Sequence, residues 1–123
     1  HWNVKGPAFI ALHKLFDDVA GAAAEYAHEL AERAGQLGGE ARGTARDTAK
    51  NSRLKEYPHG LESGRKHVQA VSAALAAFGA AARKAIDRAD ALGDKGTADL
   101  YTEISRGIDK WLWFVEAHLH AES

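Results

Sequence analysis

The sequence predicts an all-α fold, built from long helices in one domain. Alanine, the strongest helix former, supplies 26 of the 123 residues, whereas β-branched Val and Ile are few. A chain of this length has no room for two hydrophobic cores. Only 30 apolar side chains are larger than alanine, so a lone chain has a thin core. We therefore expect a helical bundle whose alanine-rich helices pack closely against a partner.

The first long helix is expected over residues 9–37. Apolar side chains recur there at intervals of three and four residues, which places them on one face of a helix. They are Phe9, Leu12, Phe16, Val19, Ala20, Ala23, Ala27, Leu30, Ala34 and Leu37. Gly38 and Gly39 then end the helix.

A long crossover link follows, over residues 40–64. It contains Gly, Asn, Ser and Pro, with a short helix expected at residues 45–51. Pro58 keeps Tyr57 extended and closes the link.

Two further long helices are expected after the crossover. Residues 63–92 form the first and end near Gly93, and the last helix starts near Thr97, with Thr97 or Asp94 as its cap. The inward residues of the first are Val68, Val71, Leu75, Phe78, Ala82 and Ile86. Those of the last are Leu100, Ile104, Ile108, Trp111, Leu112, Val115 and Leu119.

Residues 1–5 are interpreted as the end of another helix, whose N-terminal part is missing from this sequence. Gly6 and Pro7 then turn the chain into the next helix. On this interpretation, residues 1–123 form one four-helix domain with a truncated first helix. The long crossover makes the topology up, down, down, up.

Composition excludes several classes of protein. The net charge of −1 argues against a chain built chiefly as a basic clamp for nucleic acid. Without cysteine, the chain has no disulfide, and a metal site must use His and carboxylate ligands, which suits a cytoplasmic protein. The longest apolar run, residues 73–82, is too short to span a bilayer, so no membrane role is expected.

Two pairs of potential metal ligands lie on one stripe of the first long helix. His13 and Asp17 are four residues apart, as are His28 and Glu32. The pairs are 15 residues apart, about 22 Å along a helix, so one helix cannot bring all four to one metal ion.

A second copy of the chain solves this problem. If two such helices pack antiparallel about a two-fold axis, each pair faces the other pair of the partner, which forms two identical intersubunit sites. Small residues lie where the backbones approach: Gly21 and Ala24, then Ala31 and Gly35. His1 is a further nitrogen ligand that folds back toward His13.

Plainer interpretations remain open for these residues. Either pair alone is typical of a solvated helix face. His67 is expected as a core histidine or a cap, His59 as a loop residue, and His118 with His120 as a frayed end. Trp111 and Trp113 are expected in the core and in an interface.

Several motifs resemble the mini-ferritins of the Dps family, DNA-binding proteins from starved cells. The motifs are His1–Gly6; the pattern Phe9, His13, Phe16, Asp17; Ala31–Ala34; Gln36–Gly39; Tyr57–Pro58; Thr97–Asp99; Ser105–Arg106; Asp109–Lys110; and Leu112–Phe114. The resemblance covers nearly the whole chain. It implies a ferritin-like four-helix subunit, a hollow dodecamer and a ferroxidase centre at the dimer interface. The implied reaction oxidises Fe(II) to Fe(III), with hydrogen peroxide preferred over dioxygen, followed by ferric mineral storage in the cage.

By this resemblance, His1, His13 and Asp17 are ligands from one subunit, and His28 and Glu32 come from its neighbour. His28 departs from the family, which mostly has Asp there. An imidazole in place of a carboxylate makes the site richer in nitrogen, which suits Zn(II) as well as Fe(II).

The resemblance also implies roles outside the ligand set. Trp2 quenches an oxidising equivalent near the centre. Asp90, Asp94 and Asp99 line an acidic iron-entry pore, although Asp94 and Asp99 equally fit simple caps of the last helix.

Two alternative functions remain open. One is a nucleoid-associated protein that compacts DNA, for which Arg42, Arg46, Lys50, Arg53 and Lys55 supply a modest basic surface. The other is a ferritin-like cage adapted to zinc.

Overall fold

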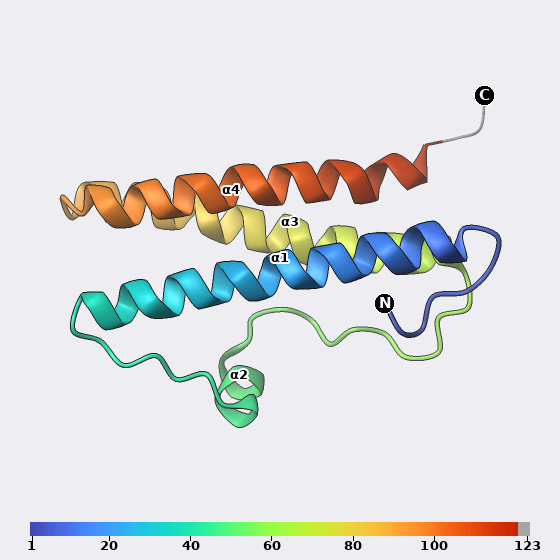
Figure 1. Cartoon of the computed structure of the whole chain (residues 1–123), viewed down its shortest axis with the longest axis horizontal. Helices are drawn as coiled ribbons and strands as arrows, with labels where there is room; N and C mark the ends of the chain where they lie inside the picture. Colours follow the sequence, from blue (N-terminus) through green and yellow to red (C-terminus); the bar gives the residue numbers. More distant parts are fainter. Residues whose placement is uncertain (121–123) are drawn as a thin grey trace.

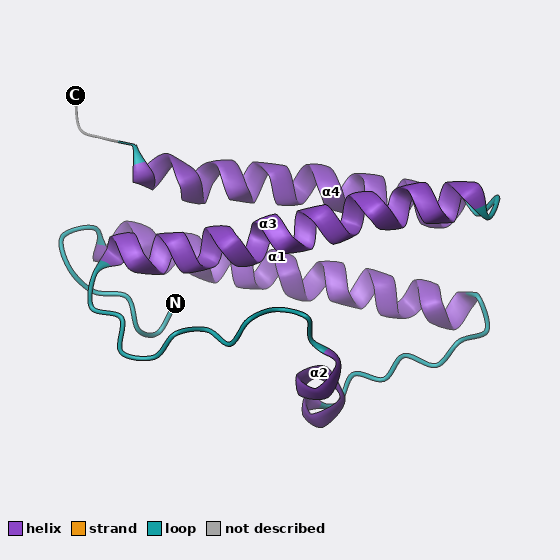
Figure 2. Cartoon of the chain, turned by 180° about the vertical axis from the view of Figure 1, so that it is seen from behind, coloured by secondary structure: helices purple, strands orange, loops and turns teal. Residues whose placement is uncertain are grey.

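The structure, a computed structural model, describes residues 1–120. Three long helices lie alongside one another: α1 (Phe9–Gln36), α3 (Gly64–Ala91) and α4 (Lys95–Glu116) (Figure 1). A short helix, α2 (Ala45–Asn51), interrupts the crossover, and a 3-10 turn, η1 (Ala117–Leu119), follows α4. No strand forms within residues 1–120 (Figure 2). The all-α prediction and the long crossover are confirmed.

Local sequence explains where α1 ends and where α3 begins. α1 ends as Gly38 takes a φ of 89°, a conformation that glycine adopts without strain. α3 begins after Ser63, whose side chain accepts a hydrogen bond from the backbone N–H of Lys66. The predicted limits of both helices agree with the structure to within a residue.

The last helix begins slightly earlier than its expected start near Thr97. Of the two candidate caps, the structure uses Asp94, whose side chain accepts a hydrogen bond from the backbone N–H of Thr97. α4 therefore starts at Lys95, directly after the turn at Gly93. The interpretation of Asp94 as a cap is confirmed.

The core lies between α3 and α4, with one side of α1 packed against them. Its buried side chains are Val4, Leu12, Phe16, Val68, Leu75, Ala82, Ile104, Ile108 and Val115. Ala20 and Ala27, expected on the inner face of α1, are exposed instead. The reason is that α1 contacts α4 far more than α3, so only part of its apolar face is covered.

An apolar groove of about 390 Å³ runs between α1 and α3, beneath the crossover. Val19 and Ala23 line it from α1, and Val71, Leu75 and Phe78 line it from α3. The expectation that a longer first helix belongs to this bundle stays a prediction.

Residues 1–5 are not helical, contrary to their interpretation as a helix end. Five residues do not repay the cost of starting a helix unless neighbouring residues extend it. Val4 nevertheless enters the core with 3% of its surface exposed, which holds this N-terminal segment against the bundle.

Tryptophan burial differs between the two predicted positions on α4. Trp111 is half-buried against the core, as expected, and Trp113 is 68% exposed. Among the described helices, none combines the length and the apolarity that a membrane span requires.

Candidate metal centre

His1 and His13 bind each other's backbone at the start of α1. Nδ1 of His1 lies 2.9 Å from the carbonyl oxygen of His13, and Nδ1 of His13 lies 2.9 Å from the carbonyl oxygen of His1. A carbonyl only accepts hydrogen bonds, so each Nδ1 carries the proton. In the neutral rings, both Nε2 atoms then keep the lone pair that binds a metal ion.

Ring stacking fixes this arrangement further. The two imidazoles stack with their centroids 4.2 Å apart, and Phe9 stacks on His13 at 5.0 Å. The structure therefore brings His1 back to His13, as expected from the sequence.

Asp17 adds a carboxylate one turn along α1. Its Oδ1 atom lies 3.8 Å from Nε2 of His1, and its side chain is 68% exposed. His1, His13 and Asp17 thus form a group of two imidazoles and a carboxylate, which we call the N-terminal ligand group. Such a donor set suits Fe(II) or Zn(II).

His28 and Glu32 form a second group toward the other end of α1, which we call the C-terminal ligand pair. Nε2 of His28 lies 3.2 Å from Oε1 of Glu32, and both side chains are 63% exposed. Neither is engaged with α3 or α4 by any hydrogen bond or ion pair in the described part of the chain.

The two groups do not meet within one chain. In residues 1–120 of a single copy, neither the N-terminal ligand group nor any other three His, Asp or Glu side chains lie close enough together to hold a metal ion by themselves. The helix surface between and beyond the groups consists of exposed small residues: Gly21, Ala24, Ala31 and Gly35. At Gly21 and Gly35, a Cβ atom would have no neighbour within 4 Å. This face of α1 is open to another helix.

Trp2 lies beside the N-terminal ligand group in the sequence, but its side chain is 88% exposed. The indole makes no hydrogen bond within the described residues. Its predicted role in quenching an oxidant stays a prediction.

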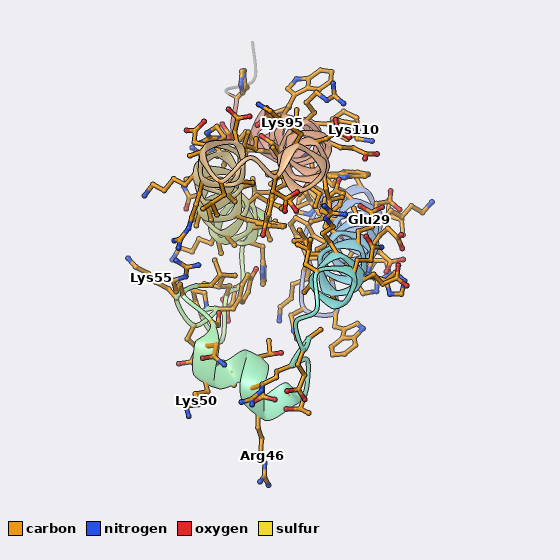
Figure 3. The ribbon with its side chains drawn as sticks, turned by 90° about the vertical axis from the view of Figure 1, so that its left-hand side faces the viewer. Glu29, Arg46, Lys50, Lys55, Lys95 and Lys110 are labelled. Carbon is orange, nitrogen blue, oxygen red and sulfur yellow. The ribbon has the colours of Figure 1, made fainter. Side chains whose placement is uncertain are left out.

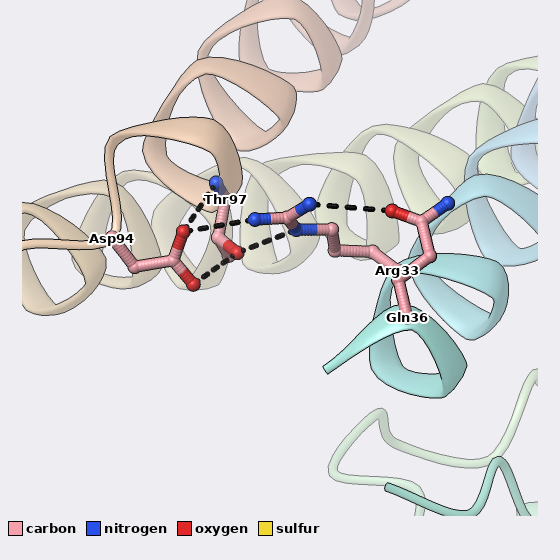
Figure 4. Close-up of polar contacts among 4 residues, drawn as sticks. All are labelled: Arg33, Gln36, Asp94 and Thr97. Atoms are coloured by element: carbon pink, nitrogen blue, oxygen red, sulfur yellow. Dashed lines mark hydrogen bonds and ion pairs between the residues drawn. The ribbon is translucent and has the colours of Figure 1, made fainter. Parts of the chain in front are cut away.

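Two of the three predicted pore carboxylates, Asp90 and Asp94, are paired within the chain, and Figure 4 shows the contacts of Asp94. Asp94 accepts hydrogen bonds from Thr97, and its Oδ1 lies 3.0 Å from Nη2 of Arg33. The hydrogen bonds from Thr97, together with the Arg33 charge, lower the pKa of Asp94 below its usual 3.8. Asp90 pairs with Lys95, whereas Asp99 is exposed and has no ion-pair partner in residues 1–120.

Sequence reasoning missed the role of Arg33. This side chain links the end of α1 to the start of α4, because it also donates hydrogen bonds to Thr97 and Gln36. Its spacing on α1 gives no signal for this link, since its partners on the α4 side, Asp94 and Thr97, lie more than 60 residues away.

Comparison with known proteins identifies the family. A model of the ferritin-like domain matches residues 1–122. The DNA protection during starvation protein of Agrobacterium fabrum is 41% identical over 123 residues, which cover all of this chain and 76% of that protein. The chain belongs to the ferritin-like Dps family. General stress protein 20U of Bacillus subtilis is 32% identical, over 97% of this chain and 81% of that protein.

Solved Dps structures share the fold. Dps from Staphylococcus aureus superposes with a TM-score of 0.93 at 32% identity, over 99% of this chain and 81% of that one. Dps from Listeria innocua, solved after a zinc soak, gives a TM-score of 0.90 at 27% identity, over 97% of this chain and 80% of that one. The ferritin-like fold predicted from the sequence is confirmed.

Proposed function

We propose that this chain is a mini-ferritin that oxidises Fe(II) to Fe(III) with hydrogen peroxide and stores the ferric product. The observation that carries the proposal is the exposed face of α1, which presents two complementary ligand groups. The N-terminal ligand group supplies two unprotonated Nε2 atoms and a carboxylate, and the C-terminal ligand pair supplies an imidazole and a carboxylate. Together they are the donors that iron oxidation requires.

The proposed centre needs two copies of the chain. In an antiparallel pair of α1 helices, the N-terminal ligand group of one copy faces the C-terminal ligand pair of the other. Gly21 and Ala24 provide the clearance for the two backbones. Two identical centres form for each two-fold pair, and a hollow dodecamer contains six such pairs in the tetrahedral assembly that the family resemblance implies.

The reaction balances for two iron ions and one peroxide. Two Fe(II) each give one electron to hydrogen peroxide, and two protons complete two water molecules, so no hydroxyl radical is released. Imidazole and carboxylate ligands hold the iron and stabilise its additional positive charge. Glu32, with two carboxylate oxygens, is the ligand that would bridge the ions in this proposal. Trp2 supplies an electron when a single oxidising equivalent remains.

Metal preference depends on His28. The family mostly has Asp at this position, so this chain replaces a negative charge with a neutral nitrogen donor. This change favours Zn(II) relative to the usual site, and zinc is an alternative occupant of the same centre. A zinc-soaked relative of the same fold is consistent with that alternative.

Iron entry is assigned to the acidic turn between α3 and α4. Asp99 is the carboxylate there that is free to meet an arriving cation, because Asp90 and Asp94 are already paired with Lys95 and Arg33.

Subunit mixing tests the intersubunit centre directly. His13→Ala and Glu32→Ala each remove a ligand from both centres of a two-fold pair, so each variant loses rapid peroxide-driven Fe(II) oxidation. When equal amounts are unfolded and reassembled together, a mixed pair contains one centre with both mutations and one intact centre. Since half of the pairs are mixed, activity returns to about a quarter of the wild-type rate.

The matched control is Glu29→Ala, which removes a half-buried carboxylate from the same helix without removing a proposed ligand (Figure 3). It retains the wild-type rate, and size-exclusion chromatography shows all variants assembled. Wild-type rates in His13→Ala or Glu32→Ala would refute the ligand assignment. No recovery on mixing would refute the intersubunit arrangement.

A second candidate function, DNA binding, is favoured by the segregation of charge in the crossover. Residues 42–55 carry a net charge of +4, although the whole chain is −1. We call the five cationic side chains the basic crossover surface: Arg42, Arg46, Lys50, Arg53 and Lys55. All five residues are exposed, and within residues 1–120 only Arg42 makes an ion pair, at 3.6 Å from Glu40.

The basic crossover surface faces away from α4. Figure 3 shows Arg46, Lys50 and Lys55 projecting on the side of α2, far from Lys95 and Lys110. Arg46 and Lys50 are one turn apart on α2, so they point in similar directions and suit neighbouring phosphates of a nucleic acid backbone.

A further inference from the structure

His67 is a buried imidazole that the proposed iron chemistry does not use. It lies in the first turns of α3, and only 4% of its surface is exposed. Nδ1 lies 2.6 Å from the hydroxyl oxygen of Tyr57, and Nε2 lies 3.2 Å from the carbonyl oxygen of Leu61. The rings of Tyr57 and His67 also stack, with centroids 5.8 Å apart.

The chemistry of these partners defines the direction of each hydrogen bond. The Leu61 carbonyl only accepts, so Nε2 of His67 donates to it. In the neutral ring, Nδ1 then accepts a hydrogen bond from the Tyr57 hydroxyl. Burial raises the pKa of Tyr57 above 10.0, which is consistent with a hydroxyl that keeps its proton and donates.

One imidazole thus ties two points of the crossover to α3. Tyr57 and Leu61 both lie in the last part of the crossover, just before the cap residue Ser63. Without these two hydrogen bonds, residues 52–62 would have few attachments to the bundle, because they form no helix and nearly all are exposed.

The same region borders the segment that carries His1. A cavity of about 340 Å³ separates them, with Asn3 and Lys5 on one wall and Tyr57 and His67 on the other. At the first residue of α3, a Cβ on Gly64 would lie 3.0 Å from Cδ1 of Leu12 and 3.9 Å from the Lys5 carbonyl oxygen. The start of α3 is therefore in close contact with the N-terminal segment and with α1.

The core completes this connection. Val68, the residue after His67, is 1% exposed and belongs to the same buried cluster as Val4 and Leu12. Val4 is the buried residue of the N-terminal segment, three positions from the proposed ligand His1. A shift at the start of α3 removes packing from Val4 and hence from the segment that holds His1 against His13.

We propose that Tyr57 and His67 form a positioning latch, which fastens the crossover to α3 and so holds the His1 segment in its metal-binding position. Neither residue touches the metal ligands. The consequence for metal binding rests on the proposed function, whereas the consequence for chain mobility does not.

Limited trypsin digestion tests the latch without any metal. Tyr57→Phe keeps the aromatic ring and removes only the hydroxyl, so the variant remains folded. We expect cleavage after Arg53, in the crossover, and after Lys5, in the N-terminal segment, to accelerate several-fold. Tyr101→Phe, which removes a hydroxyl from α4 that makes no hydrogen bond in the described residues, leaves both rates unchanged. Unchanged cleavage after Lys5 in Tyr57→Phe overturns the latch.

Cobalt binding tests its effect on the ligands. Co(II) reports imidazole coordination through its visible absorption. Because Tyr57 acts only through the chain, we expect Tyr57→Phe to weaken the Co(II) affinity by a few-fold, less than the roughly ten-fold loss that follows removal of a direct hydrogen-bond partner of a ligand. In a His1→Ala background, Tyr57→Phe has no further effect, because its influence passes through His1. Additive losses in the double variant would overturn the proposed route.

The two proposals fail in different ways. If wild-type protein bound no Co(II) and oxidised no iron, the proposed function would be refuted. The trypsin digestion would still show whether Tyr57 and His67 fasten the crossover and the N-terminal segment. If wild-type protein binds Co(II) and Tyr57→Phe binds it equally well, the positioning role is refuted and the iron centre stands.

Discussion

The hydroxyl of Tyr26 on α1 occupies the space that a Cβ atom would need at Gly107 on α4. This contact joins α1 to α4, and the Tyr26 ring also lies edge-on to Phe78 of α3, with 6.3 Å between the ring centroids. The Tyr26 side chain of α1 therefore contacts both α3 and α4 and helps to set the distances between these helices. Glycine is required at position 107 because a larger residue would overlap the Tyr26 hydroxyl.

Substitution of Gly107 tests this contact. Gly107→Ala forces Tyr26 to move, and we expect the free energy of unfolding to fall by about 1–3 kcal/mol, despite the better helix propensity of alanine. Urea denaturation measures the change. The control is Gly43→Ala in the crossover, where a Cβ meets nothing within 4 Å and stability stays within about 1 kcal/mol of wild type. Equal stabilities for the two variants would contradict the contact.

Acid sensitivity follows from Asp94. Its pKa is lower in the folded chain than the usual 3.8, through the hydrogen bonds from Thr97 and the charge of Arg33. A carboxyl group of this kind contributes stability above its unfolded pKa, and that contribution is lost as pH falls through the folded pKa. We therefore expect Asp94→Asn to be less stable than wild type at pH 7, with the difference shrinking below pH 3.8.

Urea denaturation at a series of pH values checks this prediction. Asp99→Asn is the matched control, since it removes the same charge from an exposed position without an ion-pair partner in residues 1–120. If the difference in unfolding free energy between Asp94→Asn and wild type stayed constant from pH 7 to pH 3, it would contradict the stabilising role of the ionised Asp94 side chain.

The departure at position 28 is testable by restoring the usual family residue. His28→Asp exchanges a neutral nitrogen donor for a carboxylate, so we expect weaker zinc retention and faster peroxide-driven iron oxidation. Zinc affinity measured by competition with a chelator, and stopped-flow absorbance of Fe(III), report the two effects. An unchanged ratio of zinc affinity to iron oxidation rate would count against a role for His28 in metal choice.

Salt dependence distinguishes DNA binding from incidental charge. If the basic crossover surface contacts phosphates, log affinity for duplex DNA falls linearly with log salt, and Arg46→Gln with Lys50→Gln reduces the slope by about two. Lys84→Gln with Arg106→Gln removes the same charge from α3 and α4 and leaves the slope unchanged. No gel shift of wild-type protein in low salt would dismiss this second function.

Much of the fold was predictable because the relevant signals are local. The spacing of apolar residues, the glycines after α1 and the caps at Ser63 and Asp94 all act within a few residues of one another. The start of α4 was expected slightly late, because Asp94 and Thr97, three residues apart, are both good cap residues. The side-chain geometry at the helix start selects between them.

The site was predictable only in part. The four-residue spacing of His13 with Asp17 and of His28 with Glu32 is visible in the sequence, since residues one turn apart on a helix are neighbours. The ion pair between Arg33 and Asp94 could not be predicted, and neither could the hydrogen bond between Tyr57 and His67, because each depends on how separate segments of the chain pack together. The packing of Tyr26 against Gly107 could not be predicted either, because the spacing of residues along a helix does not show which glycine contacts an aromatic ring.

The separation of the two ligand groups along α1 also has a kinetic consequence. On the proposed function, a subunit on its own lacks a complete centre, so the rate of iron oxidation depends on the square of the concentration of free subunits until pairing is complete. A newly synthesised chain is then inactive toward iron and peroxide. Ferric iron forms only after the protein that must contain it has begun to assemble.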